Sequence, residues 1–233
     1  MYDLLETDIS FDYVNELMKR CEGIKAALTG GWATFFYVND NYKKAFGIDY
    51  LKSRDIDVFI YPEDMSKFKE IIEGLGFEKG SYFFRYELIY DRERKKVISK
   101  ESAKKEQIYN LFYVFLDLFS FKSDKLKVWE LDFLKQAEIA KINDFMIVDI
   151  DVLTKLKCIS FFEREKLDKE FKDASDIYAL LLYSERKIRL NDNIKNAIRK
   201  ILSRDDLCEF IAESVLRDVF KAGIVKASLK NLL

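Results

Sequence analysis

The chain has 233 residues, of which 49% are apolar and 15% aromatic, enough to bury a substantial hydrophobic core. Its 40 Lys and Arg residues balance 41 Asp and Glu residues, so a net charge of -1 predicts no overall basic field for nucleic acid, and any polyanion site must be local. The sequence contains no histidine, which excludes Ser-His-Asp and Cys-His nucleophiles, histidine bases and zinc-histidine hydrolases. An enzyme with this composition would use carboxylates, lysines or metal ions.

Cysteine usage and hydropathy indicate a reduced environment. Cys21, Cys158 and Cys208 are scattered and form no CxxC pair, which argues against a disulfide framework and a zinc site. The first residues lack a basic flank and a long apolar run, and no later stretch approaches the ~20 apolar residues of a membrane span. We therefore expect a soluble cytoplasmic protein with no membrane contact.

The first half of the chain alternates predicted helices and strands. We expect helices at 11–22, 32–46 and 63–77, and strands at 26–29, 55–61, 81–91 and 108–121. Between the last two strands, residues 92–106 contain seven basic and three acidic side chains. This stretch is typical of a solvated hairpin or loop, with an RNA-facing flap as the alternative.

Residues 151–221 have helical periodicity only. No proline-rich or glycine-rich linker separates the two halves. The sequence therefore predicts an α/β (α+β) fold in which a mixed-sheet domain, 1–150, is followed by a helical domain, 151–233.

Two carboxylates stand in the strand "DIDVFIY". Residues two apart on a strand point to the same face, so Asp55 and Asp57 are side by side and would repel each other. A divalent cation would remove this repulsion, because Mg²⁺ binds carboxylate oxygens together with substrate phosphates. The alternative is an edge strand whose two acids are simply hydrated.

A glycine pair precedes this strand. Gly30 and Gly31 end a short strand where a helix begins, and their lack of side chains would let backbone N–H groups approach a phosphate. A glycine pair alone is only a turn. Its combination with Ser53, Asp55 and Asp57 in the next strand is much rarer.

These motifs, "GGWA" followed by "KSRDIDVF", resemble the nucleotidyltransferase superfamily of the DNA polymerase β type. They are most similar to its small prokaryotic and archaeal members, the AbiEii-like and MenT-like proteins. The 24 positions from Gly31 to Asp55 exceed the usual length of the family's helix, so we expect residues 39–50 to be an insertion near the cleft. Arg54 is expected to face either the phosphates or the opposite surface of the sheet.

The resemblance implies a third carboxylate on a neighbouring strand. Asp117, in the apolar "FYVFLDLFSF", fits this role, with Glu87 and Asp91 as competing candidates. As a metal ligand, Asp117 would be repelled by the other two acids in the absence of metal. As a structural residue, it would instead hold hydrogen bonds within an apolar strand.

The resemblance also extends to the helical half. AbiEii-like proteins carry a lysine-rich helix followed by a K/R-D-x-x-D helix, and the matching residues here are Lys155, Lys157, Lys172, Asp173 and Asp176. The resemblance implies that exposed lysines bind the nucleotide triphosphate and that the two acids orient them. An ordinary solvated charged helix is the alternative.

Taken together, the resemblance implies a metal-dependent nucleotidyltransferase. Mg²⁺ or Mn²⁺ would be held by Asp55, Asp57 and Asp117; the nucleoside triphosphate (NTP) substrate would contact Gly30, Gly31 and Ser53; and the helical domain would form one wall of the cleft. The implied acceptor is an RNA 3′ end, such as that of tRNA, in a toxin-antitoxin or phage-defence setting with a possible antitoxin protein. Small-molecule and protein hydroxyls stay open as acceptors. The alternative from another class is a non-catalytic nucleotide-sensing or protein-binding module.

Overall fold

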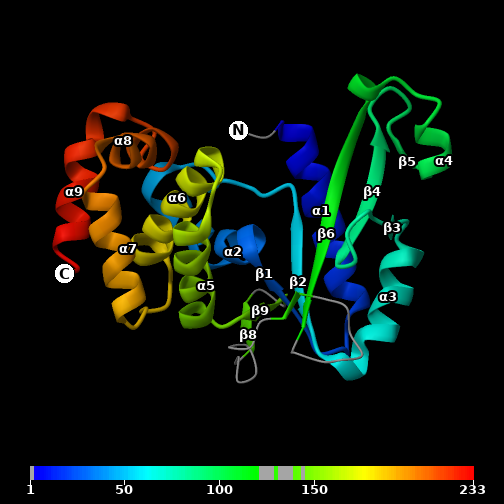
Figure 1. Ribbon diagram of the computed structural model, residues 1–233, viewed down its shortest axis with the longest axis horizontal. Helices are drawn as coiled ribbons and strands as arrows, with labels where there is room; N and C mark the ends of the chain where they lie inside the picture. The colour runs from blue at the N-terminus through cyan, green and yellow to red at the C-terminus, as the bar shows by residue number, and fades with distance from the viewer. Residues whose placement is uncertain (1–2, 121–128, 131–138, 143–144) are drawn as a thin grey trace. The chain divides into compact units, whose positions relative to one another are not determined.

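The computed structural model describes residues 3–120, 129–130, 139–142 and 145–233 (Figure 1). The chain divides into two compact units. The α/β unit comprises Met1–Ala33 and Lys52–Val148, and the helical unit comprises Thr34–Leu51 and Asp149–Leu233. One boundary falls inside the helix α2, so residues 34–51 are grouped with the helical unit, whereas the sequence divides the chain once, at 150.

The α/β unit is built on one mixed sheet. Its helical segments are α1 (Leu4–Arg20), the start of α2 (Gly30–Phe46), the 3-10 turn η1 (Pro62–Asp64), α3 (Met65–Gly74), α4 (Lys100–Ala103) and η2 (Ile108–Asn110). The described strands are β1 (Ala26–Thr29), β2 (Ile56–Ile60), β3 (Glu78–Lys79), β4 (Arg85–Asp91), β5 (Lys96–Ile98), β6 (Leu111–Ser120), β7 (Trp129–Glu130), β8 (Ile139–Ile142) and β9 (Phe145–Val148).

The order of strands across the sheet is β3-β4-β6-β2-β1-β9-β8, with β5 beside β4 and β7 beside β6. The central strand β2 runs parallel to β6 and antiparallel to β1. Strand β4 runs antiparallel to β6 on the other side. Strands β1, β2 and β6 are therefore paired on both edges, and their apolar runs supply much of the core: Leu28, Ile56, Val58, Phe59, Leu116 and Leu118 are at most 1% exposed.

Helix α1 follows from its sequence. Asp3 caps it by accepting a hydrogen bond from the backbone N–H of Leu5, at 2.9 Å. Its buried residues recur at helical spacing, at Thr7, Ser10, Val14 and Leu17, and the helix packs against β6 and α3. From this helix Ser10 accepts a hydrogen bond at 3.0 Å from the indole Nε1 of Trp32, which fixes the first turn of α2.

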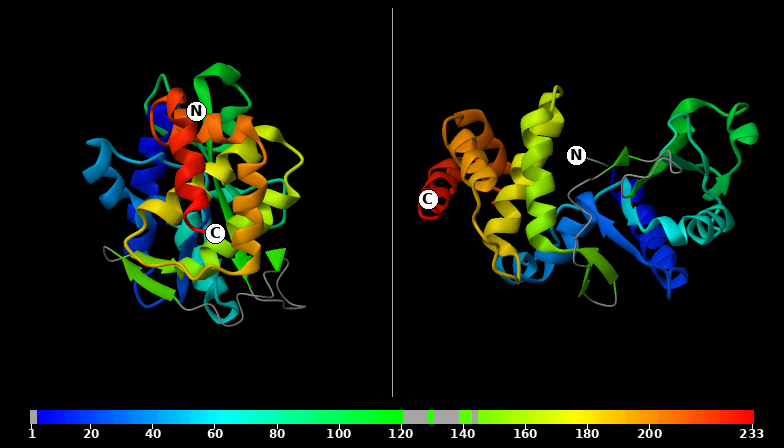
Figure 2. Two further views of the ribbon diagram at one scale, coloured as in Figure 1. Left: turned by 90° about the vertical axis from the view of Figure 1, so that its left-hand side faces the viewer. Right: turned by 60° about the horizontal axis from the view of Figure 1, so that its bottom comes forward.

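The helical unit contains α5 (Ile150–Glu163), α6 (Leu167–Tyr183), α7 (Asp192–Leu202), α8 (Asp205–Ser214), the 3-10 turn η4 (Val219–Lys221) and α9 (Ala222–Lys230). Figure 2 shows these helices from two further directions. Helix α5 packs against α6 and α7, and α8 packs against α6, α7 and α9. Each of α5 and α7 begins at an acidic or amide cap: Asp149 accepts from the N–H of Asp151, and Asn191 accepts from that of Ile194.

Residues 34–51 join the helical unit through buried aromatic side chains. The hydroxyl of Tyr42 donates a hydrogen bond to the carbonyl oxygen of Val215, at 2.6 Å. The Tyr42 ring also contacts those of Phe46, Tyr50 and Tyr183. The segment expected to be an insertion is thus the second half of α2 with a short extension, and it has its own packing partners.

The structure confirms the α/β (α+β) class with a mixed sheet and a helical second half. Of the last predicted strand of the first half, Phe121 lies outside the described residues. The charged stretch 92–106 contains β5, which forms a hairpin with β4. Several of its basic side chains are ion-paired: Arg92 with Asp3 and Glu6, Arg94 with Asp91 and Glu106, Lys100 with Glu87, and Lys104 with Glu101.

The three cysteines are buried free thiols, as the sequence predicts. Burial raises the pKa of Cys21 and of Cys158 to about 12, so neither is a reactive thiolate at neutral pH. In the part of the chain that the structure describes, no helix is long and apolar enough to cross a membrane.

Glu170 provides a test of the helical unit. This buried carboxylate is paired with Lys200 at 2.7 Å and Arg204 at 2.8 Å. Burial raises the pKa of Glu170, but the hydrogen bonds from these two cations together outweigh it, so the pKa lies below its ordinary value of 4.5. A carboxyl group with a lowered pKa stabilises the fold above its ordinary pKa, and this stabilisation is lost as the pH falls through the folded-state pKa.

We therefore expect Glu170→Gln to lower the free energy of unfolding at pH 7 by about 1–3 kcal/mol. The difference from the unchanged protein should shrink as the pH falls below 4.5. Urea melts at several pH values measure this, with the exposed Glu209→Gln as a control expected to change stability by less than about 0.5 kcal/mol. A difference that stays constant on acidification would contradict the assigned pairing.

Candidate functional site

The sheet aligns four polar residues in one row across four strands. Arg85 of β4 is the cross-strand partner of Asp117 of β6, Asp117 is the partner of Asp57 of β2, and Asp57 is the partner of Thr29 of β1. Direct cross-strand partners project from the same face of a sheet. The register therefore places two carboxylates side by side, with a guanidinium at one end of the row and the glycine turn at the other.

The glycine turn is in contact with Asp57. Gly30 has φ +63°, a conformation that favours glycine, and a Cβ built on it would lie 1.9 Å from Asp57 Oδ2. The carboxylate therefore occupies the space that any side chain at position 30 would need. The sequence assigns the close approach at this turn to a phosphate, and the structure shows a carboxylate of the protein beside Gly30.

Asp117 is held by Arg85. Arg85 Nε and Nη2 donate to the two carboxylate oxygens of Asp117, each at 2.7 Å, in the bidentate geometry that makes the strongest arginine–carboxylate pairs. The hydrogen bond to Asp117 raises the pKa of Arg85, and the nearby carboxylates of Asp55 and Asp57 raise it further. Of the two alternatives for Asp117, this pairing agrees with the hydrogen-bonded structural one, and its role as a metal ligand stays a prediction.

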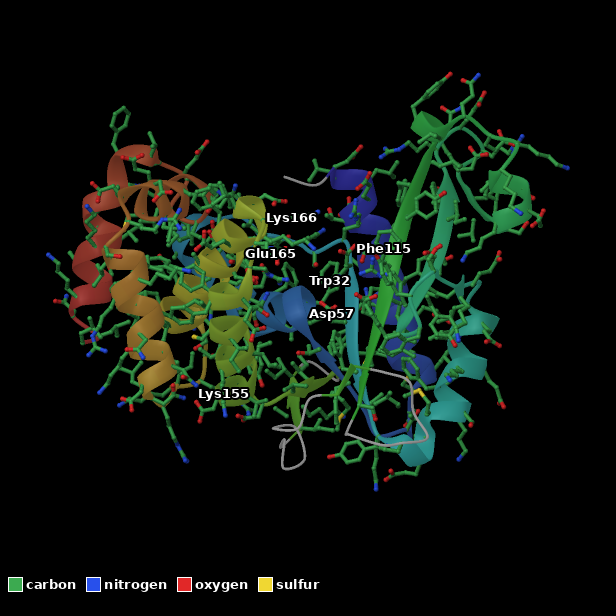
Figure 3. All side chains as sticks on the ribbon, viewed as in Figure 1. Trp32, Asp57, Phe115, Lys155, Glu165 and Lys166 are labelled. Carbon is green, nitrogen blue, oxygen red and sulfur yellow. The ribbon has the colours of Figure 1, made fainter. Side chains whose placement is uncertain are left out.

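An aromatic ring supports both arginines of this site. The guanidinium of Arg85 lies 4.5 Å from the centre of the Phe115 ring, and that of Arg54 lies 5.8 Å from it. Arg54 Nε donates to Asp55 Oδ1 at 3.2 Å. Arg54 thus lies beside the acids, and a contact with phosphates stays a prediction. Figure 3 labels Asp57, Trp32 and Phe115, from β2, α2 and β6.

Ser53, which precedes Asp55 and Asp57 in the sequence motif, is 4% exposed, and its hydroxyl donates to the backbone oxygen of Asp55 at 3.2 Å. It therefore fixes the backbone that presents Asp55. The two competitors of Asp117 have other partners. Glu87 pairs with Lys100 at 3.1 Å, and Asp91 accepts hydrogen bonds from the backbone of the β4–β5 turn. Of these three acids, Asp117 is the direct neighbour of Asp57.

The donor chemistry of the row fits a divalent cation in part. Asp55 and Asp57 offer carboxylate oxygens, which Mg²⁺ and Mn²⁺ prefer, and the Asp55 side chain is 32% exposed. Asp117 fits less well as a third ligand, because the guanidinium of Arg85 already balances its charge and donates to both of its oxygens. Among residues 3–120, 129–130, 139–142 and 145–233, no three His, Cys, Asp or Glu side chains are grouped so that they could hold one metal ion.

The helical unit brings together a second set of sequence-predicted residues. Lys157 of α5 is 8% exposed and pairs with Asp176 at 2.6 Å and with Asp173 at 3.4 Å, both on α6. Arg164 Nε also donates to Asp173, at 2.7 Å. The expectation of an exposed Lys157 is therefore wrong, because two nearly buried carboxylates hold the ammonium group inside the unit.

Tyr50 belongs to the same cluster and was not anticipated from the sequence. Its hydroxyl donates to Asp176 Oδ1 at 3.0 Å. Burial raises the pKa of Tyr50 well above its ordinary value, and the charge of Asp176 adds to this effect. Lys155 and Lys172 are half-buried on α5 and α6, and their role in binding nucleotide stays a prediction. Figure 3 labels Lys155 on α5.

No protein-family model and no curated protein matches this sequence. Among solved structures, JHP933 from Helicobacter pylori is similar over 100% of this chain and 96% of its own, with 13% identity and a TM-score of 0.53. An antigenic nucleotidyltransferase-like protein from Paracoccidioides brasiliensis is similar over 91% of this chain and 97% of its own, with 16% identity and a TM-score of 0.47. ANT(2'')-Ia in complex with adenylyl-2''-tobramycin is similar over 94% and 96%, with 11% identity and a TM-score of 0.43.

These neighbours include nucleotidyltransferase-like proteins, and the similarity to JHP933 shows a shared fold. At these levels of identity, activity must be argued from the residues of this chain. The AbiEii-like and MenT-like assignment stays a resemblance of short motifs.

Gly30 gives a direct test of the contact between the turn and Asp57. We expect Gly30→Ala to destabilise the α/β unit by more than the about 1–2 kcal/mol that a left-handed backbone alone costs, because the new methyl group would overlap the carboxylate. Gly23→Ala is the matched control, since Gly23 also has positive φ, +79°, but has nothing within 4 Å of the added Cβ. Denaturant melts of both variants measure the difference.

The same contact predicts coupling between the two positions. Combining Gly30→Ala with Asp57→Ala should recover about 0.5–3 kcal/mol relative to the sum of the single changes. Strictly additive effects, or equal losses for Gly23→Ala and Gly30→Ala, would contradict the assigned contact.

Lys157 gives a test of the helical cluster. Lys157→Met keeps most of the side-chain volume but leaves Asp173 and Asp176 without the ammonium group, so we expect the free energy of unfolding to fall by about 3–5 kcal/mol. Lys169→Met, at an exposed position of α6, is the control and should change stability by less than about 0.5 kcal/mol. Equal losses of stability for Lys157→Met and Lys169→Met in denaturant melts would contradict the assigned ion pairs of Lys157.

Proposed function

We propose that this chain binds an NTP and transfers its nucleoside monophosphate to an acceptor hydroxyl, releasing pyrophosphate. One observation carries the proposal: the row that joins Arg85, Asp117, Asp57 and the turn at Gly30. A metal-bound NTP combines a divalent cation with a polyanionic triphosphate. The row offers carboxylates to the first, and guanidinium groups and backbone N–H groups at a helix start to the second.

In this proposal Asp55 and Asp57 hold Mg²⁺ or Mn²⁺, which would neutralise charge on the triphosphate when bound. The N–H groups of Gly30 and Gly31 bind phosphate oxygens, and Ser53 keeps the Asp55 backbone in place. Arg54 and Arg85 are within reach of the carboxylates and supply positive charge for the phosphates.

The reaction is an in-line displacement at the α-phosphorus. The acceptor oxygen forms a bond to that phosphorus, and the bond from the phosphorus to the bridging oxygen of the β-phosphate breaks, so that pyrophosphate leaves with the electron pair. The proton of the acceptor hydroxyl passes to a carboxylate of the row or to water. The residues of the row accelerate this step by holding both reactants in line and by balancing the charge that develops.

The helical unit contributes differently from what the motif implies. Lys157 is neutralised by Asp173 and Asp176, so its proposed role is to fix α5 against α6. Lys155 and Lys172 stay the proposed contacts to the nucleotide from this unit. This division of roles rests on the different burial of the three lysines.

The acceptor is proposed from the motif resemblance alone. An RNA 3′ end, such as that of tRNA, is our first candidate, with a toxin-antitoxin role and an antitoxin protein as the corresponding partner. Small-molecule and protein hydroxyls are chemically equivalent acceptors. A non-catalytic nucleotide-sensing module is the second candidate function, and the closed ion pair between Arg85 and Asp117 favours it, because a permanently neutralised Asp117 would serve packing.

Transfer of label decides between these two functions. The purified chain is incubated with each α-labelled NTP, Mg²⁺ and total cellular RNA. We expect label in RNA with at least one NTP, and a loss of at least about 100-fold in rate for Asp57→Asn, because the variant lacks a carboxylate beside the turn. Glu209→Gln is the control. Label in the protein or in a small molecule would replace RNA as the acceptor, whereas the absence of transfer together with measurable NTP binding would support the sensing module.

A further inference from the structure

We propose that Arg85 takes the place of a divalent cation at Asp117, so that the carboxylate row binds one divalent ion, at Asp55 and Asp57, and not a second. The inference deepens the proposed function and rests on it for the nucleotide, although its test counts metal ions without nucleotide. It starts from the disagreement between the three-acid metal site that the motif resemblance implies and the ion pair that the structure contains.

The carboxylate of Asp117 is already paired with Arg85. Both carboxylate oxygens of Asp117 accept hydrogen bonds from Arg85 at 2.7 Å. Inner-sphere binding of Mg²⁺ or Mn²⁺ would need at least one of these oxygens at about 2.0–2.2 Å from the ion. The guanidinium would then share a carboxylate oxygen with a divalent positive charge that repels it.

Several contacts hold the side chain of Arg85 at Asp117. It begins β4, opposite Asp117, so the sheet register itself sets the pairing. Its guanidinium lies 4.5 Å from the centre of the Phe115 ring and 5.5 Å from that of Tyr82. A planar cation stacked on aromatic rings and paired with a carboxylate by two hydrogen bonds is well ordered, unlike a long lysine side chain.

The charges of the acids and arginines at the row also favour a single divalent ion. Asp55, Asp57 and Asp117 contribute three negative charges, and Arg54 and Arg85 contribute two positive ones through direct ion pairs with Asp55 and Asp117. One divalent ion therefore changes the sum of these five charges from -1 to +1, although Arg54 also lies 3.5 Å from the carboxylate of Glu6. The positive guanidinium of Arg85 would repel a second ion. The same guanidinium also interacts electrostatically with the carboxylates of Asp55 and Asp57.

The competing account is a row that opens on metal binding, in which Arg85 leaves Asp117 and two ions bind. The two accounts differ in the number of bound ions and in the effect of removing Arg85. A titration with Mn²⁺ alone distinguishes the two accounts without any transfer reaction. Binding is measured by the loss of the free-ion signal in electron paramagnetic resonance. Folding of each variant is checked by circular dichroism.

We expect the unchanged protein to bind one Mn²⁺ at the row, and a count of none or of two would contradict the inference. Arg85→Gln should gain one Mn²⁺ per chain or bind Mn²⁺ at least about tenfold more tightly, because it frees the Asp117 carboxylate. Adding Asp117→Asn to Arg85→Gln should abolish this gain, and Arg85→Lys, which keeps the charge, should not produce it. Arg94→Gln is the control for simple loss of a positive charge, since Arg94 pairs with Asp91 and Glu106.

Two bound ions in the unchanged protein, one of which is lost in Asp117→Asn, would overturn the inference, as would an Arg85→Gln variant that gains nothing. If Arg85→Gln does not fold, Asp117→Asn alone decides, because an unchanged Mn²⁺ count supports the inference and a lower one contradicts it. Equilibrium dialysis of the unchanged protein with labelled NTP is run separately. A failure to bind NTP would remove the proposed function, while the Mn²⁺ counts would still decide the role of Arg85.

Discussion

The site depends on one electrostatic constraint: carboxylates that a sheet register places side by side need positive charge. Asp57 and Asp117 are direct partners on parallel strands and project from the same face. Their repulsion is relieved by Arg85, which the register of the adjacent antiparallel strand places beside Asp117. Because the two hydrogen bonds of Arg85 are fixed by strand pairing, the same register that creates the charge conflict also resolves it.

In the helical unit, neighbouring carboxylates are likewise paired with positively charged side chains. Asp173 and Asp176 share a face of α6 at i and i+3; Lys157 of α5 pairs with both, and Arg164 supplies the second positive charge at Asp173. Tyr50 and Arg164 complete the hydrogen bonding. In the described part of the chain no buried side-chain nitrogen or oxygen lacks a hydrogen-bond partner, as the cost of burying polar groups requires. The charged motif of this unit is therefore a connection between helices before it is anything else.

Local patterns predicted much of this fold. The glycine pair marked the start of α2, because a turn depends on neighbouring residues, whereas β2 begins at Ile56, so that of the two acids only Asp57 lies within it. Strand register and burial were not predictable from one sequence. Arg85 meets Asp117 across 32 positions, and Tyr50 meets Asp176 across 126. Lys157 reads as a surface lysine until the packing of α5 on α6 is known, since its burial depends on contacts that helical periodicity does not specify.

The central claim is that the row beside Gly30 receives the triphosphate, with Arg85 still at Asp117. A crystal structure of the chain with Mg²⁺ and an α,β-methylene NTP analogue tests it most directly. The account predicts phosphate oxygens within hydrogen-bond distance of the Gly30 and Gly31 N–H groups, one metal ion at Asp55 and Asp57, and Arg85 in contact with Asp117. A triphosphate bound away from the glycine turn, or a metal ion bound directly to Asp117, would contradict it.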